Sequence, residues 1–248
     1  VTGLLGDGGA ASAASISSPT QAWIDSGEQY MYIVSRGGHR LRRIDMRSGG
    51  NVVSTYAGDG TAGSSGDGGA ASDAQLIKPW GTWGDSVGNV YVSEDGAHQV
   101  RLINSSGIIQ RYAGTTNTAG DLGDAGQATA ARLNRPLNLA GDTAGNLFIA
   151  EFDNFKIRKV AYGTSVISTY VSALGNKPIG LFLHAPTNNL YITGGGRVQM
   201  VDGTTMALTT VAGGGTGGDI GDGGVATNAK LVSAYGVWVA KTSKNIYI

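Results

Sequence analysis

The stretch GDGGAASDAQLIKPWGTW, residues 66–83, joins a glycine-rich segment with one early aspartate to a Pro-Trp-Gly step. Taken alone, it fits three structures: a loop that cradles a phosphate, a loop that binds calcium, or a connector between strands. The first two predict a ligand or ion site, whereas the third predicts a scaffold. The choice depends on whether the stretch is unique in the chain.

The stretch is not unique. Copies begin at residues 6, 123 and 221, and a shortened unit enters through GNKP at 175–178. Each copy is followed by a turn and an apolar strand such as NVYVSED, then a strand of alternating polarity such as HQVRLIN, then a β-branched run such as GIIQRYAG. Four short strands in units of about 40–50 residues are typical of propeller blades. We therefore predict an all-β fold, a β-propeller of four-stranded antiparallel blades with almost no helix.

The order of these motifs resembles the NHL-repeat β-propeller family. The shared elements are GDGG, Ala-x-Leu-x-x-Pro, Asp-x-x-Gly-Asn-(Leu/Val)-Tyr-Val, Arg-(Ile/Val)-Arg and a terminal Ala-Gly. The resemblance covers the whole chain, although the fourth unit lacks the glycine loop and the basic pair. It implies one domain over residues 1–248, with blades at 6–58, 66–114, 123–172 and 175–213 and a partial blade at 221–248. Because propellers of this family close with about six blades, we expect the chain to be part of a longer polypeptide.

The composition narrows the classes of partner. Eighteen basic residues balance eighteen acidic ones, so the chain lacks the positive charge typical of a nucleic-acid binder. No cysteine is present, which excludes disulfides, zinc-thiolate sites and thiol nucleophiles. No apolar run approaches the ~20 residues that span a bilayer. We expect no nucleic-acid partner and no membrane insertion, and the low charge, the many Ser, Thr and Gly residues and the family resemblance favour an extracellular or cell-surface location.

Two glycine-rich motifs match the sequence pattern of a dinucleotide-binding site. GDGTAG at 58–63 and GGGTGG at 213–218 both fit the dinucleotide-binding pattern G-x-G-x-x-G. That pattern requires a crossover helix after the last glycine, whereas the glycine-rich segment that follows the first motif is too short for one. Since the loop also recurs at blade spacing, no cofactor is expected.

The early aspartate of the GDGG loop raises the question of calcium. The equivalent carboxylates are those of Asp7, Asp67, Asp124 and Asp222. Calcium takes about 6–8 oxygen ligands, and one carboxylate per loop supplies few of them. We favour an Asx-type turn, in which the carboxylate accepts hydrogen bonds from its own turn and the glycines adopt positive φ. Calcium binding at these loops stays open at this point.

The histidines do not form a catalytic pattern. His39 and His98 occupy equivalent places before the third strand, where NHL-like repeats commonly carry a histidine, and Phe155 takes that place in the third unit. Only His184 lies near an innermost strand. Because catalytic zinc needs several converging ligands, we predict no catalytic residue and no metal site. A metal-dependent lyase or lactonase, which some NHL-like proteins resemble, is the alternative function.

Aromatic residues recur at one register of the innermost strands. Trp23, Trp83 and Trp238 lie four residues after the marker position, and Ala140 and Phe182 take their place in two units. Such a register can line a sugar site, but both faces of every propeller sheet are buried. We expect these side chains to pack between blades.

One face of the propeller is the predicted interaction surface. If the strands run in order from the axis outward, the loops entering each blade and the loops between second and third strands share one end of the molecule, where binding loops are often found. We expect a non-enzymatic scaffold that contacts a protein or glycan there or at the blade edges. The residues assigned to this face are Arg36, His39, Glu94, Asp95, His98, Glu151, Asp153 and Asn154, and Asn104 begins a glycosylation sequon in a predicted turn.

Overall fold

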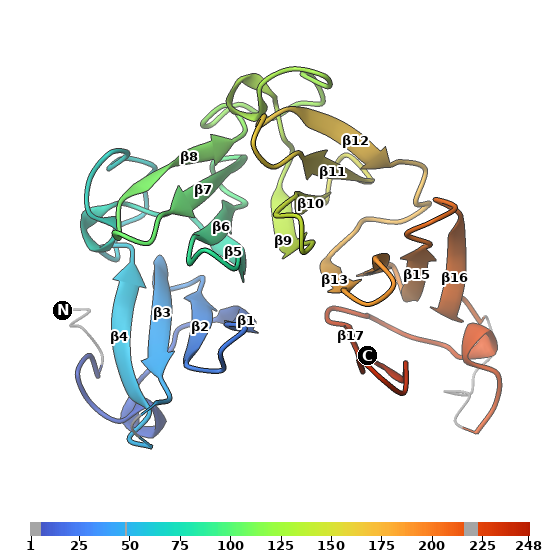
Figure 1. The fold of residues 1–248 in the computed structure, drawn as a ribbon, viewed down its shortest axis with the longest axis horizontal. Coiled ribbons are helices and arrows are strands. Elements are labelled where there is room, and N and C mark those ends of the chain that lie inside the picture. The colour runs from blue at the N-terminus through green and yellow to red at the C-terminus, as the bar shows by residue number, and fades with distance from the viewer. Residues whose placement is uncertain (1–5, 48, 216–222) are drawn as a thin grey trace.

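The strands form a series of sheets around an arc, as Figure 1 shows for the computed structural model, which describes residues 6–47, 49–215 and 223–248. Four sheets have four antiparallel strands each, and a fifth has two. In every sheet the strands pair in chain order, so each sheet is one blade. The predicted all-β fold and its arrangement of four-stranded antiparallel blades are confirmed.

The strand bounds follow the repeat. The first blade contains β1 (Pro19–Ile24), β2 (Tyr30–Ser35), β3 (Arg40–Asp45) and β4 (Val52–Ala57). The second contains β5 (Pro79–Gly84), β6 (Val90–Glu94), β7 (Gln99–Ile103) and β8 (Ile109–Ala113). The third contains β9 (Pro136–Gly141), β10 (Leu147–Glu151), β11 (Lys156–Val160) and β12 (Ile167–Val171). The fourth contains β13 (Gly180–His184), β14 (Asn189–Gly194), β15 (Arg197–Val201) and β16 (Leu208–Gly213), and the partial fifth contains β17 (Trp238–Val239) and β18 (Ile246–Tyr247).

The core lies between blades. Every residue of β6 and of β10 is buried, because neighbouring sheets cover both faces of each strand. Strands covered on both faces are apolar throughout instead of alternating, which explains the VYV and LFI runs. One cluster of buried side chains joins the first blade to the second, another joins the second to the third, and a third joins the third to the fourth.

Helix is limited, in the residues described, to four short 3-10 turns. They are η1 (Ala11–Ala13), η2 (Ala71–Asp73), η3 (Ala128–Ala130) and η4 (Ala226–Asn228), and each lies in a connector after its glycine loop. None of the described helices has the length and apolar character needed to cross a membrane. The expectation of almost no helix is confirmed.

The glycine loop connects consecutive blades. In the second blade, Gly68 N–H donates to Ile109 O on the outer strand at 2.8 Å, and Leu76 is fully buried as the anchor of the connector. Gly66 has φ +96°, and a Cβ there would lie 2.7 Å from Ala74 Cα, so only glycine fits. The GDGG loops therefore run along the outer strands, at the perimeter of the arc. The first two residues of the copy that begins at residue 221, including Asp222, lie outside the described residues.

Neighbouring blades fit one another by size at the end of the innermost strands. Trp23 packs where the next blade has Gly84, and a Cβ at that glycine would overlap the indole ring. At Ala140, where the aromatic residue is lost, the opposing Leu183 is larger, whereas Phe182 keeps an aromatic ring and opposes Val239. The pairs, in order, are Trp23 with Gly84, Trp83 with Gly141, Ala140 with Leu183 and Phe182 with Val239. The prediction that this register packs between blades is confirmed for Trp23 and Trp83.

Candidate functional site

The loop face predicted to bind a partner is largely engaged within the molecule. Glu94 and Glu151 are fully buried, and Asp95 is 5% exposed. The other five predicted residues, Arg36, His39, His98, Asp153 and Asn154, are all half-buried. Instead of forming an open charged surface, these side chains bind one another and the connectors.

Alternating charges link consecutive blades across this face. Arg36 Nη2 lies 2.9 Å from Asp95 Oδ2, and Asp95 Oδ1 lies 3.5 Å from Arg135 Nε. Arg135 Nη1 is 3.5 Å from Asp153 Oδ2, whose other oxygen is 2.6 Å from Lys177 Nζ. Burial alone would raise the pKa of Asp153, but the hydrogen bond from Lys177 and the nearby Arg135 hold that pKa below its ordinary value. The series joins four blades through five side chains.

Aromatic rings support these cations. Arg135 and Lys177 lie over the Phe152 ring at 4.7 and 4.6 Å from its centroid, and Arg36 lies over Trp80 at 5.1 Å. Sequence reasoning missed Arg135 and Lys177. The signal was present, because each directly precedes the proline that marks the start of a blade.

The two loop histidines shape the turn between second and third strands. His39 has φ +52° and His98 has φ +56°, and the equivalent Phe155 and Gly196 share this left-handed conformation. His98 Nδ1 accepts the Arg135 backbone N–H at 3.1 Å, and burial lowers the pKa of His98. Their common position therefore reflects turn geometry.

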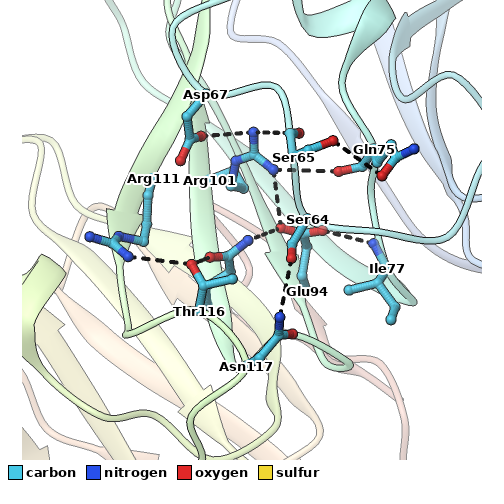
Figure 2. Close-up of polar contacts among 11 residues, drawn as sticks. Ser64, Ser65, Asp67, Gln75, Ile77, Glu94, Arg101, Arg111, Thr116 and Asn117 are labelled. Atoms are coloured by element: carbon cyan, nitrogen blue, oxygen red, sulfur yellow. Dashed lines mark hydrogen bonds and ion pairs between the residues drawn. The ribbon is translucent and has the colours of Figure 1, made fainter.

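A buried arginine binds the glycine loop of its own blade (Figure 2). Arg101 is fully buried in β7, and its Nη2 lies 2.7 Å from Asp67 Oδ1. Its Nη1 lies 3.6 Å from Glu94 Oε2, and Glu94 also accepts hydrogen bonds from the Ile77 N–H at 2.8 Å and from Gln99 Nε2 at 2.5 Å. Burial raises the pKa of Glu94 to about 7 against the opposing charge of Arg101.

The same arrangement recurs in the other blades that have a glycine loop. Arg158 lies 2.7 Å from Asp124 and 3.4 Å from Glu151, whose pKa burial also raises to about 7. In the first blade Arg42 pairs with Asp7. The expectation of an Asx-type turn is thus wrong for these three aspartates, because each carboxylate neutralises a buried guanidinium on the third strand instead of closing its own turn. The fourth blade, which lacks the loop, has Gln199 in place of the arginine.

A cavity of about 580 Å³ lies at the axis. It is bordered by the ends of the innermost strands, where the turns to the second strands begin, so it lies at the opposite end of the axis from the predicted loop face. Four aromatic residues, each from a different strand, and two amides supply much of its wall: Trp23, Trp83, Phe182, Trp238, Gln21 and Asn138.

The histidine that borders the cavity and the two carboxylates nearby are already bonded. His184 is 2% exposed, its Nδ1 lies 2.9 Å from Thr187 Oγ1, and its Nε2 lies 3.3 Å from Lys241 O. Asp85 and Asp142 border a smaller neighbouring cavity of about 220 Å³, and the Oδ1 of each accepts an N–H of its own turn at 2.9 Å. Among the residues that the structure describes, no three His, Cys, Asp or Glu side chains gather as metal ligands would.

Asn104 lies in the turn between β7 and β8, as the sequence predicted. Its Oδ1 accepts the N–H groups of Ser106 and Ile108, each at 3.0 Å, and Ser105 and Ser106 are exposed. Glycosylation there stays a prediction.

Comparisons with known proteins support the fold and leave the function open. No protein-family model and no curated protein matches the sequence. Among solved structures, a nidogen/laminin complex aligns with a TM-score of 0.67 at 13% identity, covering 95% of this chain and 73% of that one. Virginiamycin B lyase from Staphylococcus aureus aligns with a TM-score of 0.52 at 15% identity, covering 79% of this chain.

The aligned structures differ in function and in length. The chain spans 56% of the lyase, and 45% of a Bacteroides thetaiotaomicron protein of unknown function that aligns with a TM-score of 0.50 at 17% identity. The structural alignments show that the chain shares the propeller architecture of these proteins. At identities this low, they show the fold alone. Propeller-fold neighbours include both a lyase and a protein found in a binding complex.

Proposed function

We propose that this chain is a non-enzymatic NHL-type propeller that binds a protein or glycan, as part of a larger extracellular or cell-surface protein or assembly. The observation that carries the proposal is the axial cavity, which combines aromatic and amide side chains with one histidine, His184, whose two ring nitrogens are already bonded. Such a wall can hold a ligand through stacking and hydrogen bonds. Among the described residues that border it, none is a carboxylate.

The cavity is a better binding site than the loop face that the sequence indicated. On the loop face, charged side chains form ion pairs between blades, such as Arg36 with Asp95 and Lys177 with Asp153. Charge reversal at Glu94 or Glu151 would break buried ion pairs, so it would test folding instead of binding. The cavity wall keeps aromatic surface available, since Trp23 and Trp83, which border the cavity, are only half-buried.

The test compares two exposed aromatic residues. The chain is screened by biolayer interferometry against glycans and extracellular-matrix proteins, and any binder is measured again with Trp238→Ala and with Tyr162→Ala. Trp238 borders the cavity, whereas Tyr162 is 56% exposed and lies outside it. We expect Trp238→Ala alone to weaken binding by about tenfold or more, equivalent to about 1.4 kcal/mol. Equal effects of the two variants would remove the cavity from the proposal.

The metal-dependent lyase or lactonase remains the alternative. It requires several converging ligands, and the described residues do not supply three of them together. Stoichiometric metal in the purified protein, together with turnover of a lactone or of a substrate cleaved by elimination, would replace the binding proposal with this one.

A further inference from the structure

We propose that the axial cavity binds a short neutral saccharide, with tryptophan rings as stacking platforms and the Asn138 amide as its polar anchor. The inference rests on the proposed function, because it names the ligand class of the same site. Three features of the cavity carry it: an unpartnered amide, a gap in the aromatic wall, and the charge of the lining.

The first feature is the Asn138 side chain. Asn138 lies in the middle of β9, borders the cavity and is 9% exposed, and its Oδ1 is buried without a hydrogen-bond partner among the described residues. A buried polar group that lacks a partner is destabilising, so a ligand that pairs with it gains affinity. Rotation of the amide by 180° exchanges Oδ1 with Nδ2, so the group can offer the cavity an acceptor or a donor. A ligand hydroxyl, which both donates and accepts, is a suitable partner for either orientation.

The second feature is a gap in the aromatic wall beside that amide. Asn138 and Ala140 are two residues apart on β9, so their side chains point to the same side of the strand. Other innermost strands carry Trp or Phe at the register of Ala140, as Trp83 and Phe182 show. Ala140 is 5% exposed and packs in the buried cluster that also includes Leu183, so aliphatic side chains interrupt the aromatic wall beside Asn138.

A second amide lies on the first innermost strand. Gln21 Oε1 accepts the Thr82 N–H at 2.7 Å, which fixes the side chain and leaves its NH₂ group as the donor it can offer a ligand. Gln21 and Asn138 both border the cavity from separate strands. Two amides and several aromatic faces match a sugar ring, whose hydroxyls bond amides while its apolar face stacks on indole.

The third feature is charge. Among the described residues that line the cavity, none is a carboxylate and Lys241 is the one full cation. A charged ligand would need an opposite charge to offset its desolvation, which favours a neutral one. An extended peptide would need a groove with successive side-chain pockets. Here Trp23, Trp83 and Phe182 come from three strands arranged around one axis, which suits a compact ring-shaped ligand.

The experiment uses tryptophan fluorescence and calorimetry with defined sugars. Maltotriose, cellotriose, mannotriose and triacetylchitotriose are titrated into the chain, with trigalacturonate as the charged comparison and a proline-rich peptide as the non-sugar comparison. Three of the four tryptophans border the cavity, so sugar stacking should change the emission. We expect at least one neutral trisaccharide to bind, and the charged sugar and the peptide not to bind.

Two amide variants separate ligand contact from stability. Asn138→Leu removes the unpaired amide and should lower affinity by about tenfold, which is about 1.4 kcal/mol, without lowering the melting temperature. Gln199→Leu is the matched control: Gln199 is 7% exposed, its Oε1 also lacks a partner among the described residues, and it lies outside the cavity lining. Its sugar affinity should equal that of the unmodified chain.

The results that would overturn the saccharide inference differ from those that would overturn the proposed function. Binding of the peptide alone at this cavity, with loss in Trp238→Ala, would overturn the saccharide inference and keep the binding propeller. Binding of neutral sugars that Asn138→Leu leaves unchanged would overturn the role of the amide. Failure of every sugar at about 10 mM, where even the weak affinities of about 1 mM are detectable, would overturn the saccharide inference.

Discussion

Exchanging the residue pair between the second and third blades tests whether size complementarity orders the arc. Trp83 at the end of β5 packs against Gly141 at the end of β9, and a Cβ on that glycine would overlap the indole ring. At the next interface the sizes are reversed, with Ala140 on β9 and Leu183 on β13. The double variant Trp83→Ala with Gly141→Leu copies that reversed pair into the earlier interface.

The single variants should both be destabilising. Trp→Ala at a packed position costs about 3–5 kcal/mol, and Trp83 should fall near the lower bound because it is half-buried and borders the axial cavity. Gly141→Leu forces a side chain into the indole, and overpacking costs about 1–3 kcal/mol. The backbone of Gly141 lies outside the left-handed region, so the leucine adds no backbone strain.

The double variant should be more stable than the sum of the single costs by about 1–3 kcal/mol, since contacting residues couple by such amounts. Guanidinium unfolding followed by far-ultraviolet circular dichroism gives the four free energies without relying on the tryptophan that is removed. A second pair of changes, Trp23→Ala with Gly141→Leu, is the control, because Trp23 packs on Gly84 and not on Gly141. Additivity of Trp83→Ala and Gly141→Leu within about 0.5 kcal/mol would refute the size-matching explanation.

Three further changes test the buried charges and the turns. Arg101→Gln should lower the free energy of unfolding by about 3–5 kcal/mol in urea titrations, because it leaves the buried Glu94 without its cation, whereas Arg47→Gln at an exposed pair should have a much smaller effect. The raised pKa of Glu94 and Glu151, about 7 in the fold against an ordinary 4.5, means that the folded state holds extra protons in this window, so stability should fall by a few kcal/mol as pH rises from about 5 to about 8. Glu94→Gln should remove about half of that pH dependence, and an unchanged slope would show that Glu94 does not titrate there. His39→Gly should raise the melting temperature, since His39 has φ +52° and glycine relieves about 1 kcal/mol of backbone strain, whereas His39→Ala should not.

The glycine loops are connectors, as the sequence predicted, but their aspartates do not form the predicted Asx-type turns. The recurrence of GDGG at blade spacing excluded a single cofactor loop, and Leu76 is buried as the anchor that the pattern required. The partner of Asp67 was out of reach of local reasoning, because Arg101 lies 34 residues later and meets the loop only after the blade has formed. The joint absence of the loop and of the arginine in the fourth blade was a signal for the pair that lay in the sequence.

The candidate site was also predicted only in part from the sequence. The sequence identified Trp23 and Trp83 as one register of the innermost strands, and it placed the charged loop residues at one end of the axis. It could not show that Glu94 and Glu151 would be buried by neighbouring connectors, nor that Asn138 would face the axis beside the gap left by Ala140.

The sequence by itself determined the period, the four strands of each blade and the glycine connector, because these follow from turn chemistry and the polarity of adjacent residues. Only the tertiary structure decided which charges are paired, which end of the axis is hollow and which amide lacks a partner. Those properties depend on contacts between residues far apart in the sequence, either in different blades or, as for Asp67 and Arg101, within one blade. Asp67, the early aspartate of residues 66–83, is therefore the counter-ion of Arg101, and the strongest candidate for ligand binding lies at the axis.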